Sequence, residues 1–426
     1  MLLTPPNYRP RLVDARIERA MALMGAVVIE GPKWCGKTWT GLHHAQAVVA
    51  LQDPAGHYRN RRIAESDPAL LFDQPRPLLL DEWQDAPALW DAVRLEIDRI
   101  PGPGRFILTG SATPRDAATA HSGAGRVARL AMGPMTLAES GMSSKAVSLA
   151  TLFDGGPLRP ALSAMTDQSL LDMIIRGGWP GLADRPIEDA ASMVRFYLDV
   201  VTGSDASRID GIRRDPVRLA ALLASLGRNT ATLVSNTTLA RDMASTDDLA
   251  PAPRTISDDL DVLRRLHLLI EVPAWTPGLR SAARLRQAPK RLLVDPSLAV
   301  AAMRASESWL RAEPKTLGFC FETLCLRDLI EYGRTLDTSL FHYRDNAGLE
   351  VDAILVRPDG TWGACEIKAG AAQVDDAAGQ LRRLRDKMMA GGQVPPAFLV
   401  VIAGVGGHAH TRDDGVHVVP IDTLCP

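Results

Sequence analysis

The chain has 426 residues, of which 46% are hydrophobic and 23% charged, and its formal net charge at pH 7 is −2. This composition is that of a folded protein of roughly two to four domains. It excludes a helical membrane protein, because no apolar stretch approaches the roughly 20 residues that span a bilayer. The small net charge gives no overall attraction to nucleic acid, so such a partner would need a local basic surface.

Cysteine usage and the first residues of the chain bear on the compartment. The five cysteines form no C-x-x-C pair and are odd in number, so the sequence supports neither a disulfide framework nor a zinc ribbon. The N-terminal residues lack a charged segment followed by an apolar core, and no secretory signal is expected. We therefore expect a cytoplasmic protein with reduced thiols and no membrane partner.

The most informative motif follows an apolar run at residues 26–29, which predicts a buried strand. The glycines of this motif let backbone N–H groups surround phosphates at the start of a helix, while Lys37 reaches the terminal phosphates and Thr38 ligates Mg²⁺. The sequence therefore predicts a site for ATP and Mg²⁺. The motif matches G-x-x-x-x-G-K-[ST] and consists of Gly31, Pro32, Lys33, Trp34, Cys35, Gly36, Lys37 and Thr38.

A second apolar strand, at residues 77–82, ends in two carboxylates. A P-loop ATPase needs such a strand beside its first strand, with Asp81 in the Mg²⁺ shell and Glu82 as the general base that activates water. The carboxylate pair favours hydrolysis of ATP over passive binding.

A third apolar strand, at residues 105–111, ends in small polar side chains. Ser111 is a candidate sensor of the γ-phosphate, with Thr109 behind it, and a capping or turn role for Ser111 is an equal alternative. Arg126 is a candidate cation for the ATP site of a neighbouring copy, which makes a homo-oligomer a candidate assembly. The alternative is an ordinary surface arginine.

Two features near the phosphate loop have competing interpretations. Cys35 lies where backbone N–H groups lower a thiol pKa, which raises the hypothesis of redox control of ATP binding. The favoured alternative is a small residue that fits the loop. His43 and His44 are adjacent on a predicted helix and lack the i, i+4 spacing of a helical metal pair, so we interpret both as structural.

The middle of the chain is predicted to be helical. Helices at residues 168–176 and 190–201 are expected to form a lid over the nucleotide. Three later helices then lead into an apolar strand, which is the order of a winged helix. Their predicted bounds are 217–228, 236–243 and 255–266, followed by the strand at 268–272.

The winged-helix pattern allows two interpretations. Arg254, Arg264 and Arg265 are candidate contacts to DNA phosphates. Acidic residues on the same helix would repel a phosphate backbone, so an architectural role is an equal alternative to DNA reading. The most basic segment, at residues 280–291, is a second candidate surface for nucleic acid or a solvated hairpin. The acidic residues are Asp258, Asp259 and Asp261.

The C-terminal part carries a set of acidic and basic residues on predicted neighbouring elements. Glu322 lies on a helix, Asp352 on one strand, and Glu366 and Lys368 on the same face of another strand. Asp followed about a dozen residues later by Glu-x-Lys is the active-site spacing of restriction-endonuclease-like folds. Asp352 and Glu366 would hold a metal ion, and Lys368 would orient or deprotonate water for phosphodiester hydrolysis. A degenerate nuclease fold that clamps without cutting has the same pattern.

These motifs together resemble a large prokaryotic family of P-loop, AAA-type ATPases whose C-terminal half carries a domain of unknown function. The resemblance covers nearly the entire chain and implies a winged-helix segment, a nuclease-like fold, and ATP and Mg²⁺ as ligands. Trp34 and Cys35 depart from the family's loop, where smaller or more polar residues are usual. The matching segments are 31–38, 78–82, 108–111, 177–180, 293–295, 350–352 and 366–368.

Two functions follow from the whole sequence. The first is an ATPase that acts on DNA, with a metal-dependent nuclease site in the C-terminal domain. The second is an ATP-switched regulatory protein whose nuclease-like domain binds a partner without cutting. The predicted fold class is α/β, with an AAA-like P-loop NTPase core at residues 1–140, a helical lid at 141–205, a winged-helix segment at 206–310 and a restriction-endonuclease-like α/β domain at 311–426.

Overall fold

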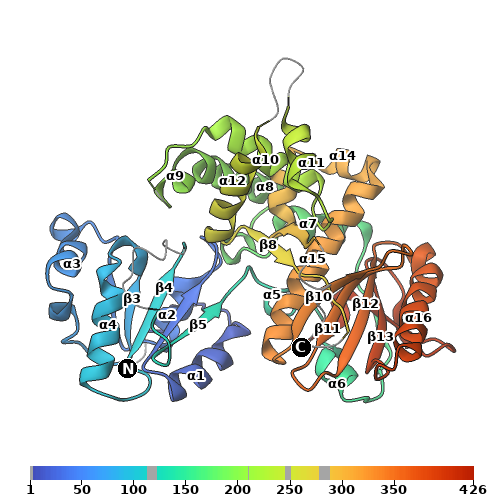
Figure 1. Ribbon diagram of the computed structural model, residues 1–426, viewed down its shortest axis with the longest axis horizontal. Helices are drawn as coiled ribbons and strands as arrows, with labels where there is room; N and C mark the ends of the chain where they lie inside the picture. The colour runs from blue at the N-terminus through green and yellow to red at the C-terminus, as the bar shows by residue number, and fades with distance from the viewer. Residues whose placement is uncertain (1–2, 113–121, 210, 245–250, 278–287) are drawn as a thin grey trace. The chain divides into compact units, whose positions relative to one another are not determined.

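The computed structural model divides into two compact units (Figure 1). Residues 280–287 of the predicted basic segment lie outside the part of the chain that the structure describes. Unit 1 comprises residues 1–134, 203–214 and 261–268, and unit 2 comprises residues 135–202, 215–260 and 269–426. The described residues are 3–112, 122–209, 211–244, 251–277 and 288–426.

Unit 1 is built on a parallel five-stranded sheet in the order β2-β3-β4-β1-β5. The strands read as continuous apolar runs because both faces of the sheet are covered by helices. Leu79 faces helix α2, while Leu78 and Leu80 join the core cluster that contains Trp90 of helix α4. The strands are β1 (Ala26–Glu30), β2 (Ala47–Ala50), β3 (Leu78–Asp81), β4 (Phe106–Gly110) and β5 (Val127–Ala131).

The position of the carboxylate strand differs from the sequence-based expectation. We expected it beside the first strand, but β4 lies between β1 and β3. Because all three strands are parallel, their carboxyl ends still meet at one edge of the sheet. The phosphate loop, Asp81 and Ser111 follow from these three ends. The helices of unit 1 are α1 (Val13–Leu23), α2 (Lys37–His44), α3 (Ala55–Ser66), α4 (Ala88–Arg99) and α9 (Ala206–Arg208).

The predicted helices of the middle segment are confirmed as elements, with small shifts in their ends. The unit boundary passes through α12, between residues 260 and 261. Strands β8 (Leu269–Val272) and β9 (Lys290–Leu293) pair as an antiparallel hairpin after α12. The helices are α7 (Asp167–Arg176), α8 (Ile187–Val200), α10 (Pro216–Arg228), α11 (Asn236–Met243), α12 (Pro253–Arg265), α13 (Pro296–Ala302) and α14 (Glu307–Ala312).

The C-terminal part of unit 2 contains a mixed seven-stranded sheet in the order β10-β11-β12-β13-β15-β14-β7. Helix α15 (Pro314–Thr335) contacts β10 and β12, and helix α16 (Val374–Ala390) packs on β11, β12 and β13 (Figure 1). Strands β10 to β12 are antiparallel neighbours, and β13 pairs parallel with β12. Their bounds are β10 (Ser339–Arg344), β11 (Glu350–Val356), β12 (Trp362–Lys368), β13 (Phe398–Ala403), β14 (His408–Thr411), β15 (His417–Pro420) and β7 (Ala161–Leu162).

Short elements complete unit 2. They are helices α5 (Leu137–Ser140) and α6 (Leu149–Phe153), and the two-stranded parallel pair β6 (Val147–Ser148) and β16 (Leu424–Cys425). Helix α5 begins with a capping box in which the Thr136 and Glu139 side chains and backbone N–H groups bond reciprocally.

A buried ion-pair network joins distant segments of unit 2. Arg327 of α15 donates to Asp295, which precedes α13, at 2.8 Å and to Asp328 at 2.7 Å, and all three side chains are at most 3% exposed. Asp295 also accepts a hydrogen bond from the Gly178 N–H at 2.9 Å. A Cβ at Gly178 would lie 2.1 Å from the Met135 carbonyl oxygen, so only glycine allows this approach. The network thus joins the 177–180 and 293–295 segments, which are both among the segments that carry the family resemblance.

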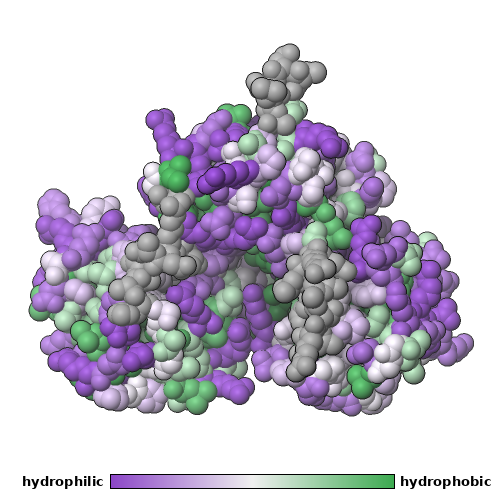
Figure 2. Space-filling model, viewed as in Figure 1, coloured by the Kyte–Doolittle hydropathy of each residue, from purple (hydrophilic) through white to green (hydrophobic). Residues whose placement is uncertain are grey.

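No helix among the described residues is both long and apolar enough to cross a bilayer. On the face in Figure 2, apolar side chains are scattered among hydrophilic ones. Single exposed apolar residues are normal on protein surfaces.

Candidate functional site

The phosphate loop lies between β1 and α2 in a tightly packed conformation. A Cβ on Gly31 would lie 2.0 Å from the Met132 carbonyl oxygen, so this position requires glycine. Gly36 has φ 103° at the start of α2, a value that also favours glycine. Trp34 has φ 73°, which for a bulky residue costs on the order of 1 kcal/mol or more. Trp34, where the sequence departs from the usual residues of the family's loop, therefore has a strained backbone conformation.

The Mg²⁺-binding groups predicted from the sequence come together beside this loop. The Thr38 hydroxyl donates to Asp81 Oδ1 at 2.8 Å, and the Thr109 hydroxyl donates to the same oxygen at 2.5 Å. Burial raises the pKa of Asp81, while the two hydroxyl bonds oppose that shift. Lys37 is 4% exposed, and its ammonium group donates to the Pro32 carbonyl at 2.7 Å. These hydroxyl, carboxylate and ammonium groups fit a Mg²⁺–phosphate ligand.

Glu82 and Ser111 are in direct contact. The Ser111 hydroxyl donates to Glu82 Oε2 at 2.8 Å, and the Gln84 amide donates to the same carboxylate oxygen. Glu82 has φ 58°, which turns its side chain at the end of β3, and its N–H donates to the Thr109 hydroxyl. Ser111 therefore contacts the residue that the sequence predicts to be the general base, and its role stays a prediction.

A cleft of about 820 Å³ in unit 1 adjoins these groups, within the size range of small-molecule sites. It is lined by Lys33, Gln84 and Ser111 from the sheet edge and by Asp205 and Arg208 from the segment before and in α9. Lys33 pairs with Asp205 at 2.8 Å. Sequence reasoning missed Asp205 and Arg208, because about 170 residues separate them from the loop and no local pattern marks them.

Arg126, the candidate cation for a neighbouring copy, has a partner in its own chain, and so does the nearby Arg129. Arg126 donates to Asp98 at 2.5 Å, and its side chain is 39% exposed. Arg129 pairs with Glu30 at 2.6 Å and lies over the Trp90 ring. To reach the ATP site of a second copy, Arg126 would have to break its ion pair with Asp98. This role stays a prediction.

Cys35 is an interior residue of the loop. Its side chain is fully buried, and the thiol donates to the Met132 carbonyl at a sulfur–oxygen distance of 3.5 Å. The Cys35 carbonyl accepts from the guanidinium of Arg11 at 2.6 Å. Oxidants would have to open this packing to reach the sulfur. The geometry favours the interpretation of Cys35 as a small residue that fits the loop.

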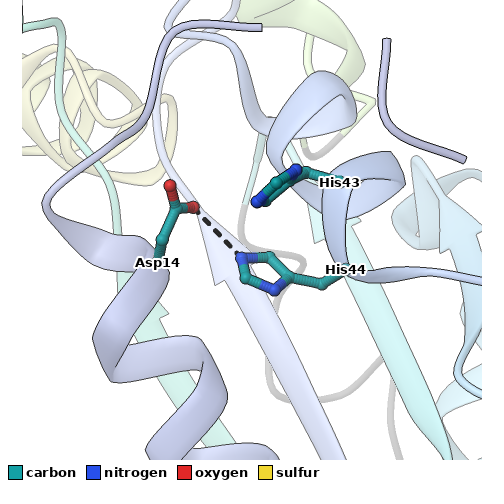
Figure 3. A group of neighbouring side chains, drawn as sticks. All are labelled: Asp14, His43 and His44. Carbon is teal, nitrogen blue, oxygen red and sulfur yellow. Dashed lines mark hydrogen bonds and ion pairs between the residues drawn. The ribbon is translucent and has the colours of Figure 1, made fainter. Parts of the chain in front are cut away.

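His43 and His44 meet Asp14 at the end of α2 (Figure 3). Their ligand-type atoms lie within 4.8 Å of one another, although the two histidines lack the i, i+4 spacing of a helical metal pair. The Asp14 carboxylate already accepts from His44 Nε2, from the Tyr8 hydroxyl and from the Arg11 N–H. The His44 bond to Asp14, and the contacts of His43 with the Thr4 hydroxyl and the Tyr8 ring, agree with the structural interpretation of the two histidines.

The predicted carboxylate and lysine residues of the C-terminal domain converge in unit 2. Lys368 Nζ lies 2.7 Å from Glu366 Oε2 and 3.5 Å from Asp352 Oδ2. The Ile367 N–H also donates to Asp352 Oδ2 at 3.0 Å, which fixes this carboxylate between β11 and β12. The alternation of β12 places Glu366 and Lys368 together, as the sequence predicted.

A second lysine, absent from the predicted set, lies in the same cluster. Lys290, the first residue of β9, is 2% exposed, and its Nζ lies 2.5 Å from Glu322 Oε1 and 3.3 Å from Asp352 Oδ1. Burial disfavours its charge, but Asp352 and Glu322 outweigh that effect and raise the pKa of Lys290. Burial likewise opposes ionisation of Asp352, yet Lys290 and Lys368 hold its pKa at about 2. Lys290 is therefore an internal cation of this cluster.

The basic-segment and winged-helix hypotheses are corrected at two points. Lys290 is buried rather than solvated, and Arg291 pairs with Glu271 of β8 at 2.9 Å. Asp259 of α12 is 1% exposed and pairs with Arg218 of α10 at 3.0 Å, so it does not face a phosphate backbone. Arg254 and Asp258 are exposed on the same helix.

His342 of β10 gives unit 2 a titratable core group. Its side chain is buried, and burial together with the nearby charge of Lys290 lowers the pKa of His342 from 6.5 to about 4. Between these values the unfolded chain binds a proton that the folded chain excludes, so the free energy of unfolding falls as pH falls from 6.5 toward 4. We expect the wild type to lose about 1–3 kcal/mol more than His342→Asn across this window.

Denaturant unfolding at pH 7 and pH 4.5 checks this expectation. His408→Asn serves as the control, because His408 is exposed on β14 and should leave the pH dependence of the wild type unchanged. Equal pH dependence of the wild type and His342→Asn would contradict the assignment of a neutral buried imidazole.

The chain is similar to known domain families, to proteins of related sequence and to solved structures. The sequence matches an AAA domain at residues 24–141 and two domains of unknown function, DUF8612 at 167–308 and DUF4143 at 317–424. Uncharacterised proteins of Mycobacterium bovis and Mycobacterium tuberculosis are each 25% identical over 342 residues, which cover 79% of this chain and 69% of theirs.

Two solved structures are similar at low sequence identity. The Walker-type ATPase of Pyrococcus abyssi has a TM-score of 0.42 and 12% identity, covering 71% of this chain and 97% of that chain. The Orc1 protein of Aeropyrum pernix, solved in complex with DNA, has a TM-score of 0.26 and 14% identity, covering 73% and 96%. The chain therefore contains an AAA domain at residues 24–141 and a C-terminal domain of unknown function, DUF4143, at residues 317–424, and the phosphate-loop geometry of unit 1 agrees with the AAA match.

Proposed function

We propose that unit 1 binds ATP with Mg²⁺ and hydrolyses it, and that this cycle controls contact of unit 2 with DNA. One observation carries the ATPase part: Lys37, the Thr38–Asp81 pair and the Glu82–Ser111 pair meet at one edge of a parallel sheet. These groups are the phosphate-binding, metal-binding and water-activating parts of a phosphoryl-transfer site. The AAA family match supports the same activity.

The residues of the site have distinct proposed roles. Mg²⁺, when bound, neutralises charge on the β- and γ-phosphates, and Thr38 and Asp81 would hold it. When ATP binds, the Lys37 ammonium group gives up its hydrogen bond to the Pro32 carbonyl and donates to phosphate oxygens instead. Glu82 accepts the proton of the attacking water, after its carboxylate exchanges a bond from Ser111 or Gln84 for that water. Ser111 thereby couples the γ-phosphate position to the general base.

Metal removal and one substitution test this proposal. We expect phosphate release from ATP to require Mg²⁺, to stop in EDTA and to fall at least about 100-fold in Asp81→Asn, because the metal then loses its carboxylate. Asp67→Asn is the control, since Asp67 is exposed after α3 and should leave turnover unchanged. Turnover that persists in EDTA would contradict a Mg²⁺-dependent mechanism.

For unit 2 we propose a winged-helix segment and a restriction-endonuclease-like domain, with the helices of residues 141–205 as a lid. Helices α10, α11 and α12 followed by the β8–β9 hairpin support the first. The order α15, β10, β11, β12, α16, β13 and the convergence of Asp352, Glu366 and Lys368 support the second. DNA is the proposed partner, because this residue set serves phosphodiester chemistry.

Between cleavage and binding without cleavage, the position of Lys290 favours binding. A buried ammonium group between Glu322 and Asp352 competes with the metal ion that cleavage needs. The wild type should leave plasmid, linear and branched DNA uncut in the presence of Mg²⁺ or Mn²⁺, with and without ATP. It should nevertheless bind these DNAs and slow their migration in native gels. Cleavage by the wild type that disappears in Lys368→Ala would establish the nuclease alternative instead.

A further inference from the structure

We infer that Asp14, His43 and His44 form a binding site for one divalent transition-metal ion of the Zn²⁺ type, between the start of α1 and the end of α2 (Figure 3). One ligand-type atom of each side chain lies within 4.8 Å of those of the other two. Figure 3 shows the carboxylate of α1 and both imidazole rings of α2 directed toward one another. The inference goes beyond the proposed function and depends on neither ATP hydrolysis nor DNA binding.

The closest two groups already have the separation of two ligands of one ion. His44 Nε2 lies 3.1 Å from Asp14 Oδ1. Two ligand atoms that each lie about 2.1 Å from a metal ion are about 3.0–3.4 Å apart at octahedral or tetrahedral angles. The His43 ring nitrogen needs to approach these atoms by at most about 2 Å, which rotation of its side chain allows. The metal ion would thus replace the proton that these two groups share.

The contacts of His43 prepare its ring for ligation. Its Nδ1 lies 3.2 Å from the Thr4 hydroxyl, and its ring stacks on that of Tyr8 with centroids 4.4 Å apart. A hydrogen bond at one ring nitrogen fixes the tautomer and the orientation of a ligating histidine. With Nδ1–H donating to Thr4, the neutral ring keeps the Nε2 lone pair for a metal ion. The structural contacts of the histidines are therefore compatible with a metal site.

The carboxylate ligand is held in the same way. Asp14 Oδ1 accepts from the Tyr8 hydroxyl at 2.8 Å, and Oδ2 accepts from the Arg11 N–H at 2.8 Å. Ligating carboxylates in metal sites are commonly oriented by such outer hydrogen bonds. The side chains of His44 and Asp14 are 10% and 15% exposed, so the ligands are shielded and still accessible to an ion.

The chemistry of the donor set selects the class of ion. Two imidazole nitrogens and one carboxylate suit Zn²⁺, Co²⁺ and Ni²⁺, whereas Mg²⁺ and Ca²⁺ prefer sites made only of oxygen. Both histidines lie in the last turn of α2, where the carbonyl groups of a helix favour a positive charge. One carboxylate gives the set a single negative charge, which a divalent cation more than neutralises. The remaining coordination positions are open to water.

Zn²⁺ binding by the full chain without nucleotide, measured by isothermal titration calorimetry, is the test. The parent protein is His408→Asn/His410→Asn, because these residues form a second histidine pair on β14, with ring centroids 4.7 Å apart. We expect the parent to bind one Zn²⁺ per chain. His43→Gln, introduced into the parent, should weaken this binding at least tenfold, because it removes one nitrogen ligand and keeps a polar side chain.

Further variants and a control complete the experiment. His44→Gln and Asp14→Asn should each weaken Zn²⁺ binding at least tenfold. His57→Gln makes the same change at an exposed histidine of α3 and should bind Zn²⁺ as the parent does. His43→Gln is the variant that decides if the other two do not fold, because its bond to Thr4 is exposed and its loss costs little. Equal Zn²⁺ affinity of the parent and a folded His43→Gln overturns the inference.

Thermal unfolding separates a metal site from a cluster that is only structural. A bound metal ion stabilises the folded chain by mass action, so Zn²⁺ should raise the unfolding temperature of the parent and not that of His43→Gln. A purely structural cluster predicts that each substitution changes stability by the same amount with and without Zn²⁺. That result, or a parent that binds no Zn²⁺, overturns the inference. Phosphate release from ATP is measured separately, because its absence would bear on the proposed function and leave this site intact.

Discussion

Replacement of Glu82 by Gln is expected to lower the rate of ATP turnover by about 10²–10³-fold while ATP stays bound. The amide cannot accept the proton of the attacking water, so the chemical step loses its general base. The proposed ATP-binding groups Lys37, Thr38 and Asp81 are unaltered, since their bonds do not involve the Glu82 side chain. Steady-state phosphate release and the nucleotide content of the purified protein after incubation with ATP measure the two effects.

The supporting residue and a matched control sharpen this prediction. Ser111→Ala should lower turnover by about tenfold, less than Glu82→Gln, because it removes one hydrogen bond that positions the base. Glu18→Gln makes the same chemical change at an exposed position of α1 and should leave turnover unchanged. Turnover in Glu82→Gln within twofold of the wild type would remove Glu82 from the mechanism.

Replacement of Arg327 by Leu is expected to destabilise unit 2 by about 3–5 kcal/mol. The substitution leaves Asp295 and Asp328 fully buried without their cation. The remaining donors are all neutral: they come from Gly178 and Ser297 for Asp295, and from Leu137 and Tyr332 for Asp328. Such a loss in the free energy of unfolding is larger than that caused by most point substitutions. Denaturant unfolding followed by circular dichroism measures it.

Arg385→Leu is the matched control for this effect. Arg385 of α16 pairs with Asp386 at the surface, and the two side chains are 33% and 66% exposed. Surface pairs of this kind contribute about 0–1 kcal/mol, so the control should unfold nearly as the wild type. Equal losses in Arg327→Leu and Arg385→Leu would contradict the role of the Arg327 network.

Much of the fold was predictable because local signals determine it. The phosphate loop requires glycine at Gly31, where a Cβ would clash with the Met132 carbonyl, and at Gly36, which has a positive φ. Its motif therefore predicts both the strand before it and the helix after it. Helix α11 has the predicted bounds of 236–243, where Ser235 caps the first turn through the N–H of Thr238. Capping and apolar periodicity are properties of a few neighbouring residues, which a sequence displays directly.

Contacts between residues far apart in the chain were harder to predict from the sequence. The insertion of β4 between β1 and β3 depends on the order in which parallel strands assemble, and each strand alone has the same apolar pattern. Likewise, Asp205 reaches Lys33 from a segment about 170 residues away. Such contacts leave no local period or cap in the sequence.

The C-terminal cluster illustrates the same distinction. The spacing of Asp352, Glu366 and Lys368 predicted their meeting, because strand alternation and antiparallel neighbours are regular. Lys290 was read as part of a basic surface, since its neighbours in the chain are basic. Its burial follows from the placement of β9, and that placement changes the expected chemistry of the site.

Steady-state phosphate release from ATP by the wild type and Lys37→Ala, with Mg²⁺ present, tests the central claim most directly. Lys37 donates to a carbonyl of the phosphate loop and is the cation that would contact the terminal phosphates. We predict Mg²⁺-dependent turnover by the wild type and a loss of at least about 100-fold in the folded variant. Equal turnover in both proteins, or none in the wild type under conditions where it binds ATP, would contradict ATP hydrolysis at this site.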